Sequence, residues 1–183
     1  MVDAVSRYVA LLRGINLGGR TIKMNALRQV CEAQGFKHVR TLLASGNVVF
    51  DSKTGSPAAV RVKLEAALKA AFGFEVHVIV RNAGEIQALV EGDPFKGVKM
   101  TPKTRLYVTF LSEPARPKLK FPKKTVLEDF EIIRVSQGQV CTVLGPKAAS
   151  TDALDFLEKI FGKNITTRNW NTIQKIHALM QSL

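Results

Sequence analysis

Apolar runs and amphipathic stretches alternate along the first half of the chain. Residues 7–12 form a nearly continuous apolar run, which is typical of a strand covered on both faces. Residues 24–34 then place apolar groups at helical spacing, and Gly35 stands where a glycine commonly follows a helix. This pattern predicts a strand, a glycine-rich loop over 13–20 and a helix.

The next forty residues extend this order. Residues 39–50 contain two strand-like runs around a turn of small residues, as in a hairpin. Ser56 and Pro57 have the order of a helix N-cap followed by proline, and the helical spacing after them ends near Gly73. Alternation over 74–80 predicts a fourth strand. Together these elements predict β-α-β-β-α-β, the order of a ferredoxin-like unit.

The second half repeats this order only in part. A short helix over 83–90 precedes a strand that begins at Arg105, and a second hairpin is expected around Gln137 and Gly138. Since 92–104 is rich in glycine, proline and lysine, it is interpreted as a linker. The predicted domains are 1–91, an N-terminal ferredoxin-like subdomain with the short helix, the linker 92–104, and the C-terminal α+β subdomain 105–183.

Two helices are expected near the end of the chain. Ser150 or Thr151 can cap the first, which Gly162 ends, and residues 166–171 are expected to open the second. The fold class is therefore α+β, with two ferredoxin-like subdomains, the second an incomplete variant that ends in two helices.

Charge adds a functional indication. The 183 residues include 27 lysines and arginines against 15 acidic residues, for a net charge of +12 and a pI near 10.0. The excess lies mainly in 1–50 and 101–150. Such a surplus favours anionic partners: nucleic acid, phosphorylated metabolites or an acidic protein surface. The basic run 116–124, which includes Leu119 and Phe121, suits phosphates and a stacked base, or else forms a solvated loop.

The two cysteines and the hydropathy indicate the compartment. Cys31 and Cys141 lie far apart in apolar patterns, which does not resemble a disulfide framework or a metal knuckle. No apolar run approaches the roughly 18 residues of a membrane span, and the first residues lack the order of a signal peptide. We therefore expect a soluble, cytoplasmic protein without a membrane partner.

The glycine loop after the first strand is the main candidate for an anion site. It matches neither the dinucleotide fingerprint nor the P-loop. Its glycines can nevertheless form a nest of N–H groups beside positive charge. Alternatively, the glycines only permit a tight crossover while the asparagine bonds its own backbone. The candidate ligand-binding residues here are Arg13, Gly14, Asn16, Gly18, Gly19, Arg20 and Lys23.

Two further polar segments are candidates. Ser45 and Asn47 flank a glycine and are candidate ligand-binding residues. As a hydroxyl nucleophile Ser45 lacks a G-x-S-x-G elbow and a paired histidine, and a hairpin turn explains the same residues. Near the end, an arginine and two asparagines surround the single tryptophan, and such residues bind phosphates or bases. A helix N-terminus, with Thr167 as its cap and the tryptophan packed, explains that segment equally. Its candidate residues are Arg168, Asn169, Trp170 and Asn171.

Metal and acid–base chemistry have no comparable candidate. His38, His77 and His177 are far apart and stand beside no second ligand at metal spacing. No catalytic residue, metal or cofactor is predicted, and the sequence makes no prediction about a reaction or an oligomeric state.

Several segments resemble a known family. Residues 8–19, Lys23-Met24 with Leu27, 45–50 and 167–172 are similar to the uncharacterised bacterial family catalogued as domain of unknown function 1697. The resemblance implies an α+β protein of two ferredoxin-like subdomains. It implies no activity, so no functional residue is carried over from it.

Three functional hypotheses follow. The first is a cytoplasmic protein that binds an anionic ligand, most plausibly nucleic acid, through Arg13, Arg20, Lys23 and the run 116–124. The second is an enzyme or sensor for a small phosphorylated or nucleotide-like ligand, with the glycine loop and 168–171 lining one pocket. The third is that these segments are structural joints between the subdomains.

Overall fold

The computed structural model describes residues 5–53, 55–115 and 127–183, so the predicted basic run 116–124 lies outside the described residues. The chain divides into two compact units. The first comprises Met1–Ala88 together with Lys175–Leu183, and the second comprises Leu89–Gln174. The predicted domain limits, with a linker over 92–104, stay a prediction.

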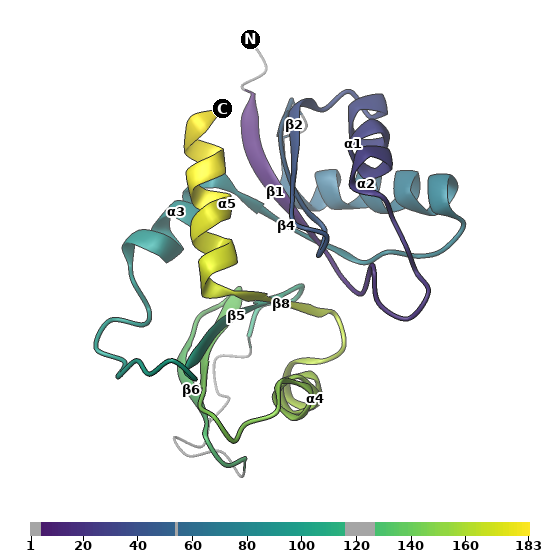
Figure 1. Ribbon diagram of the computed structural model, residues 1–183. Helices are drawn as coiled ribbons and strands as arrows, with labels where there is room; N and C mark the ends of the chain where they lie inside the picture. The colour runs from purple at the N-terminus through teal and green to yellow at the C-terminus, as the bar shows by residue number, and fades with distance from the viewer. Residues whose placement is uncertain (1–4, 54, 116–126) are drawn as a thin grey trace. The chain divides into compact units, whose positions relative to one another are not determined.

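The first unit has the predicted β-α-β-β-α-β order (Figure 1). Its elements are β1 (Ser6–Leu12), α1 (Met24–Ala33), β2 (Lys37–Leu42), β3 (Asn47–Ser52), α2 (Pro57–Phe72) and β4 (Val78–Asn82). The four strands form one antiparallel sheet in the order β2-β3-β1-β4. This is the strand order of a split β-α-β unit, and it confirms the ferredoxin-like prediction.

The core of the first unit lies between the sheet and helices α1 and α2. Tyr8, Ala10 and Leu12 alternate along β1 and pack in one apolar cluster with residues of both helices. Leu27 of α1 and Leu64 of α2 are fully buried in it. The expected helix ends are confirmed, because Gly35 and Gly73 have φ angles of 83° and 77°.

The fourth strand differs from its prediction. The alternation over 74–80 predicted a strand there, but β4 begins only at Val78. Val78 pairs with Leu12, the last residue of β1, so residues before Val78 have no β1 residue to pair with. The backbone N–H of Val78 also donates to Glu65 of α2 at 2.9 Å, which marks the start of the strand.

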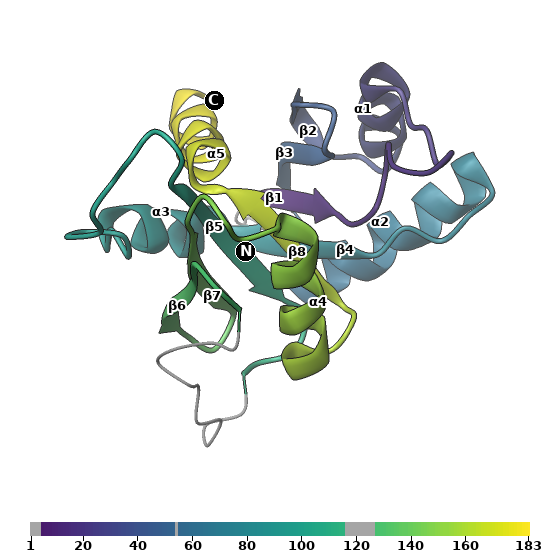
Figure 2. The same cartoon turned by 60° about the horizontal axis from the view of Figure 1, so that its bottom comes forward.

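The second unit contains a similar sheet (Figure 2). Helix α3 (Ala83–Glu91) begins in the first unit and ends in the second. The remaining elements are β5 (Arg105–Leu111), β6 (Phe130–Val135), β7 (Gln139–Leu144), α4 (Ser150–Phe161), β8 (Ile165–Asn169) and α5 (Trp170–Ser182). Helix α5 begins in the second unit and, from Lys175 on, belongs to the first. The sheet order is β6-β7-β5-β8, which matches the first sheet position by position, and α4 packs on one face through Ala153 and Leu157.

Two local predictions in the second unit were wrong. Residues 166–169 were expected to open the last helix, but they form β8 and pair with β5, so a strand separates the two helices. Thr109 and Thr167 are paired across these strands, with their hydroxyl oxygens 2.7 Å apart, and β-branched residues favour strands.

The predicted N-cap of α4 was also wrong. Its N-cap is Ala149, and the hydroxyl of Ser150 accepts from Arg105 at 3.0 Å instead.

Candidate anion-binding loop

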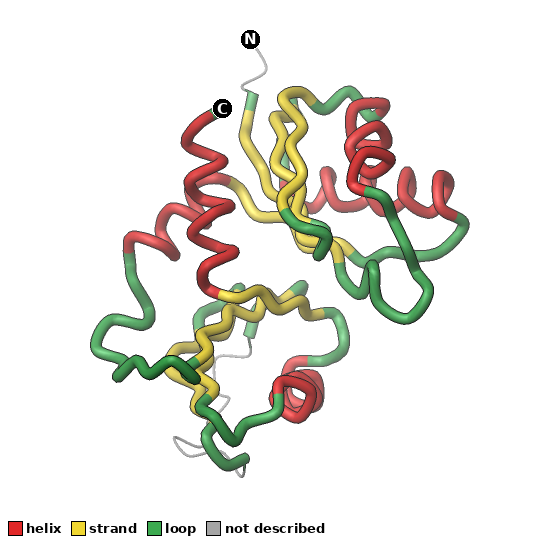
Figure 3. The backbone as a smooth tube through the Cα atoms, in the orientation of Figure 1, coloured by secondary structure: helices red, strands yellow, loops and turns green. Residues whose placement is uncertain are grey.

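The loop that joins β1 to α1 can be followed in Figure 3. Asn16 organises this loop through its hydrogen bonds. Its Nδ2 donates to the carbonyl oxygens of Ile22 at 3.2 Å and Ala44 at 2.6 Å, and its Oδ1 accepts from the N–H of Ile22 at 2.8 Å. Its own N–H donates to the oxygen of Arg20 at 2.7 Å. The φ angle of 57° at Asn16 is left-handed, which asparagine tolerates well. The Asn16 side chain is therefore committed to holding the loop.

The turn between β2 and β3 packs directly against this loop. A Cβ on Gly46 would stand 2.6 Å from Ile15 Cδ1 and 2.9 Å from Leu12 Cβ, so only glycine fits. The N–H of Leu12 donates to the oxygen of Gly46 at 2.9 Å. Asn47 is fully buried, and its Nδ2 donates to Leu42 O at 2.7 Å and Ser45 Oγ at 3.1 Å. The structure thus brings the loop and the Ser45–Asn47 turn together, and Asn47 acts within the turn.

The remaining loop residues present backbone and positive charge to solvent. Gly14, Gly18 and Gly19 are exposed and have positive φ angles, and a Cβ added at any of them would meet no atom within 4 Å. Arg20 and Lys23 are exposed, and neither forms a salt bridge with a described residue. The guanidinium of Arg20 lies 5.8 Å from the centre of the Phe74 ring. Backbone and charge at this loop are therefore accessible to an anion.

The start of α1 adds to the positive potential. Lys23 is its N-cap residue, no side chain caps the helix there, and its first turn has no acidic residue. The half-buried Arg13 precedes the glycines, and its N–H donates to the oxygen of His77 at 2.9 Å. Because helix N-termini carry partial positive charge, the field of α1 reinforces that of the cations.

Two exposed leucines lie in this loop and in the turn that it contacts. Leu17 is 71% exposed, and Leu43, which precedes Ala44 in the β2–β3 turn, is 48% exposed. Leu43 has a φ angle of 61°, a conformation that costs a branched or bulky residue free energy. Neither leucine was predicted as a site residue, because single apolar residues in loops carry no pattern.

The second polar candidate, 168–171, belongs to the second unit. Arg168 is buried and donates to Thr166 Oγ1 at 2.8 Å and to the oxygen of Thr167 at 2.9 Å. This burial lowers its pKa to about 10. Trp170 is 7% exposed and meets the ring of Phe95 edge-on at 5.1 Å. Asn169 Oδ1 accepts from the N–H of Asn171 at 2.9 Å, so much of this segment serves local packing.

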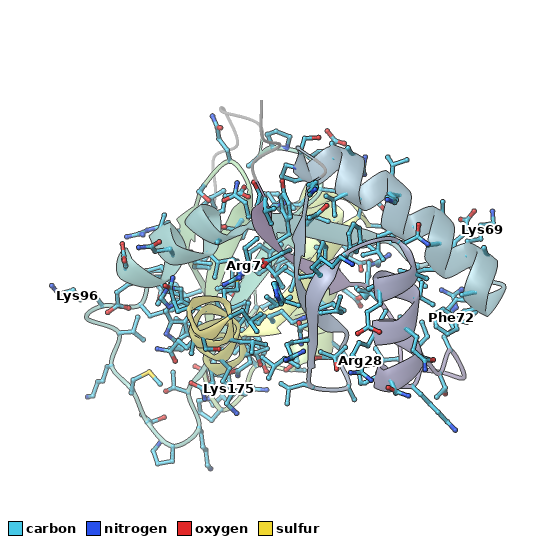
Figure 4. The ribbon with its side chains drawn as sticks, turned by 90° about the horizontal axis from the view of Figure 1, so that it is seen from above. Arg7, Arg28, Lys69, Phe72, Lys96 and Lys175 are labelled. Atoms are coloured by element: carbon cyan, nitrogen blue, oxygen red, sulfur yellow. The ribbon has the colours of Figure 1, made fainter. Side chains whose placement is uncertain are left out.

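The first sheet carries a charged cluster that was not predicted from the sequence. Arg7 donates to both carboxylate oxygens of Asp51, at 2.7 and 2.9 Å, and to the carbonyl oxygens of Met180 and Leu183, at 2.7 and 2.6 Å. His38 Nδ1 lies 2.9 Å from the same carboxylate. The hydrogen bond from Arg7 is the largest cause that lowers the pKa of Asp51, ahead of the bond from His38. Figure 4 shows Arg7 beside the strands of the first sheet.

One signal in the sequence pointed to that cluster. The apolar residues Val48–Phe50 predict a buried strand that continues into Asp51, and a buried carboxylate needs a cationic partner. In the structure every residue of Asn47–Ser52 is buried. The partner could not be chosen from the pattern, because Arg7 is one of seven basic residues in the first fifty.

The grooves and pockets elsewhere in the described residues are weaker candidates for a binding site than the glycine loop. A groove of about 250 Å³ in the first unit is lined by apolar and charged residues, among them Val76 and His77, and by Lys69 and Glu75, whose charged atoms pair at 2.9 Å. Figure 4 shows Lys69 near the end of α2. An apolar pocket of about 40 Å³ lies between α4 and the second sheet. Among the described residues, no three His, Cys, Asp or Glu side chains are placed to hold a metal ion.

The fold and loop define an α+β protein of two ferredoxin-like units with a basic, glycine-rich loop. The chain belongs to the family described as "Protein of unknown function (DUF1697)", whose model matches residues 5–140. A comparison with curated proteins gives no match. Within the described residues, no helix combines the length and apolar character needed to cross a membrane.

A solved structure supports the fold. The chain is similar to the conserved bacterial protein SP0830 from Streptococcus pneumoniae, with 24% identity and a TM-score of 0.71. The likeness covers 97% of this chain and 99% of that chain. At this identity the likeness concerns the fold alone.

Proposed function

We propose that this chain is a cytoplasmic protein that binds nucleic acid, with the phosphates contacting the glycine loop between β1 and α1. One observation carries the proposal: Asn16 fixes a loop in which exposed Arg20 and Lys23 stand beside three exposed glycines, and no described acidic side chain neutralises the two cations. A loop held in advance binds an anion without the entropy cost of ordering.

The chemistry of the loop suits phosphate. Arginine and lysine supply charge-assisted donors, and the exposed glycines allow backbone N–H groups to approach an oxygen closely. The net charge of +12 attracts a polyanion from a distance. Because this attraction is independent of base sequence, binding is expected to weaken steeply as salt increases.

The proposal is tested by fluorescence anisotropy with a labelled oligonucleotide of about 20 nucleotides at about 50 and 200 mM salt. Removal of two phosphate contacts in the double variant Arg20→Ala/Lys23→Ala should lower affinity about tenfold at the lower salt and flatten the salt dependence by about 1.5 logarithmic units per decade.

The matched control is Lys37→Ala/Lys53→Ala. In the strand register Lys37 lies opposite Asp51, and Lys53 follows Ser52, which lies opposite Ser6. Both lysines therefore lie at the end of the first sheet that is opposite the glycine loop, and both are exposed. This variant loses the same charge and should retain most of the affinity. Absence of binding at low salt, or equal losses in the two double variants, would overturn the proposal. A nucleoside monophosphate that binds as tightly as the oligonucleotide would favour a small phosphorylated ligand instead.

A further inference from the structure

The glycine loop presents apolar groups as well as charge. Leu17 follows Asn16 and Leu43 precedes Ala44, so the two exposed leucines flank the same hydrogen bond, from Asn16 Nδ2 to the oxygen of Ala44. A phosphate gains nothing from contact with an apolar side chain, whereas the face of a nucleobase packs favourably against one. The position of the leucines therefore bears on which form of nucleic acid fits the loop.

The conformation of Leu43 is held against its intrinsic preference. Its φ angle of 61° is unfavourable for a leucine, and an exposed side chain recovers little free energy by burial. The turn keeps this geometry because Asn16 binds Ala44 on one side and Gly46 is packed against Ile15. Backbone strain at an exposed residue, maintained by its surroundings, is typical of binding sites.

Arg20 offers a flat surface in the same loop as Leu17, whose backbone oxygen accepts from the N–H of Arg20 at 3.5 Å. Its guanidinium lies 5.8 Å from the centre of the Phe74 ring, and a cation–π contact of this kind limits how the side chain moves. Splayed bases stack on guanidinium planes as they do on aromatic rings. Arg20 can therefore meet either a phosphate or a base face.

We propose that the glycine loop binds single-stranded rather than double-stranded nucleic acid, with Leu17, Leu43 and the Arg20 plane contacting unstacked bases. This inference rests on the proposed function. A single strand offers phosphates and base faces within one nucleotide of each other, whereas a duplex keeps its base faces inside the stack. The loop presents charge and apolar surface side by side, which matches the single strand.

The test compares labelled single strands and duplexes of equal length against the protein and the variants Leu17→Ser and Leu43→Asn. Asparagine tolerates a positive φ angle, so the second variant removes the apolar group without disturbing the turn. The single strand should bind the unaltered protein at least about tenfold more tightly than the duplex, and each leucine variant should lose about fivefold to tenfold of that affinity with an unchanged salt dependence.

Two controls accompany the measurement. Val62 is 61% exposed on α2, so Val62→Gln removes an equally exposed apolar group and should leave affinity unchanged. Inorganic polyphosphate carries charge without bases and should bind the leucine variants as it binds the unaltered protein.

The outcomes separate the two proposals. Equal or tighter binding of the duplex, or leucine variants that bind the single strand normally, would overturn the inference, and the nucleic-acid function would stand if Arg20→Ala/Lys23→Ala still weakened binding. If neither form binds at low salt, both proposals fall.

Discussion

The side-chain amide of Asn16 donates to the carbonyl oxygen of Ala44 at 2.6 Å, which joins the glycine loop to a turn 28 residues further along the chain. Asn16→Ala removes this bond and those to Ile22, so we expect the free energy of unfolding to fall by about 2–3 kcal/mol. Urea denaturation measures the loss. Asn16→Gly tolerates the left-handed backbone, so it separates the loss of the hydrogen bonds from the strain of alanine at a positive φ angle. If Asn16→Ala were as stable as the unaltered protein, the Asn16 side chain would not hold the loop.

Gly46 is expected to tolerate no side chain. Gly46→Ala places a methyl group 2.6 Å from Ile15 Cδ1 and also strains a φ angle of 78°. Gly35→Ala is the matched control, because its φ angle of 83° is similar and its Cβ meets no atom within 4 Å. The control should cost about 1 kcal/mol and Gly46→Ala about 2 kcal/mol more, by thermal or urea unfolding. Equal costs would show that the turn yields without strain.

The Arg7–Asp51 pair predicts a specific dependence of stability on pH. The pKa of Asp51 is lowered below its ordinary value of 3.8 by the bond from Arg7 and then by that from His38. The pair therefore contributes its full stability above the ordinary pKa and loses it as the pH falls through the folded-state pKa. Urea midpoints measured from about pH 2 to 6 should drop more steeply in the unaltered protein than in Asp51→Asn.

At neutral pH the same variant tests the strength of the pair. Asp51 is 6% exposed, and Asp51→Asn leaves the Arg7 guanidinium without its carboxylate, so we expect a loss of about 2 kcal/mol. An unchanged midpoint at neutral pH, together with an unchanged pH profile, would show that the carboxylate adds nothing to stability.

The two thiols should be unreactive in the folded protein. Burial raises the pKa of Cys31 to about 12 and that of Cys141 to about 11, so almost no thiolate is present at pH 8. A chromogenic disulfide reagent should label neither cysteine in buffer and both in denaturant. Rapid labelling of either thiol in buffer would reveal local opening around it.

Local signals predicted most of the first unit correctly. Gly35 and Gly73 end helices as expected, and Ser56 caps α2 by accepting from the N–H of Ala59 at 3.2 Å. These features depend on neighbours within a few residues, which a sequence pattern contains. The start of β4 depends on where β1 ends, and that is a contact between distant parts of the chain.

The sequence indicated which residues make up the candidate site, but it did not indicate which of them contact one another. The glycines, Arg20 and Lys23 were chosen from the sequence, and the contact from Asn16 to Ala44 was not. In the sequence, residues 166–169 look like a polar helix start. They form a strand because Thr167 pairs with Thr109, and a local pattern does not contain a contact that spans 58 residues. Arg7 and Asp51 were missed for the same reason, since 44 residues separate them.

The contacts of Arg7 with Met180 and Leu183 bear on the order of events during synthesis. The last strand of the sheet that carries Arg7 ends at Asn82, yet two of the acceptors of its guanidinium are translated about a hundred residues later. At about 5–20 residues per second, this interval lasts about 5–20 s. Throughout this interval, Asp51 is the only described hydrogen-bond acceptor of Arg7 that has been translated, and the contacts with Met180 and Leu183 can form only after the whole second unit has been made.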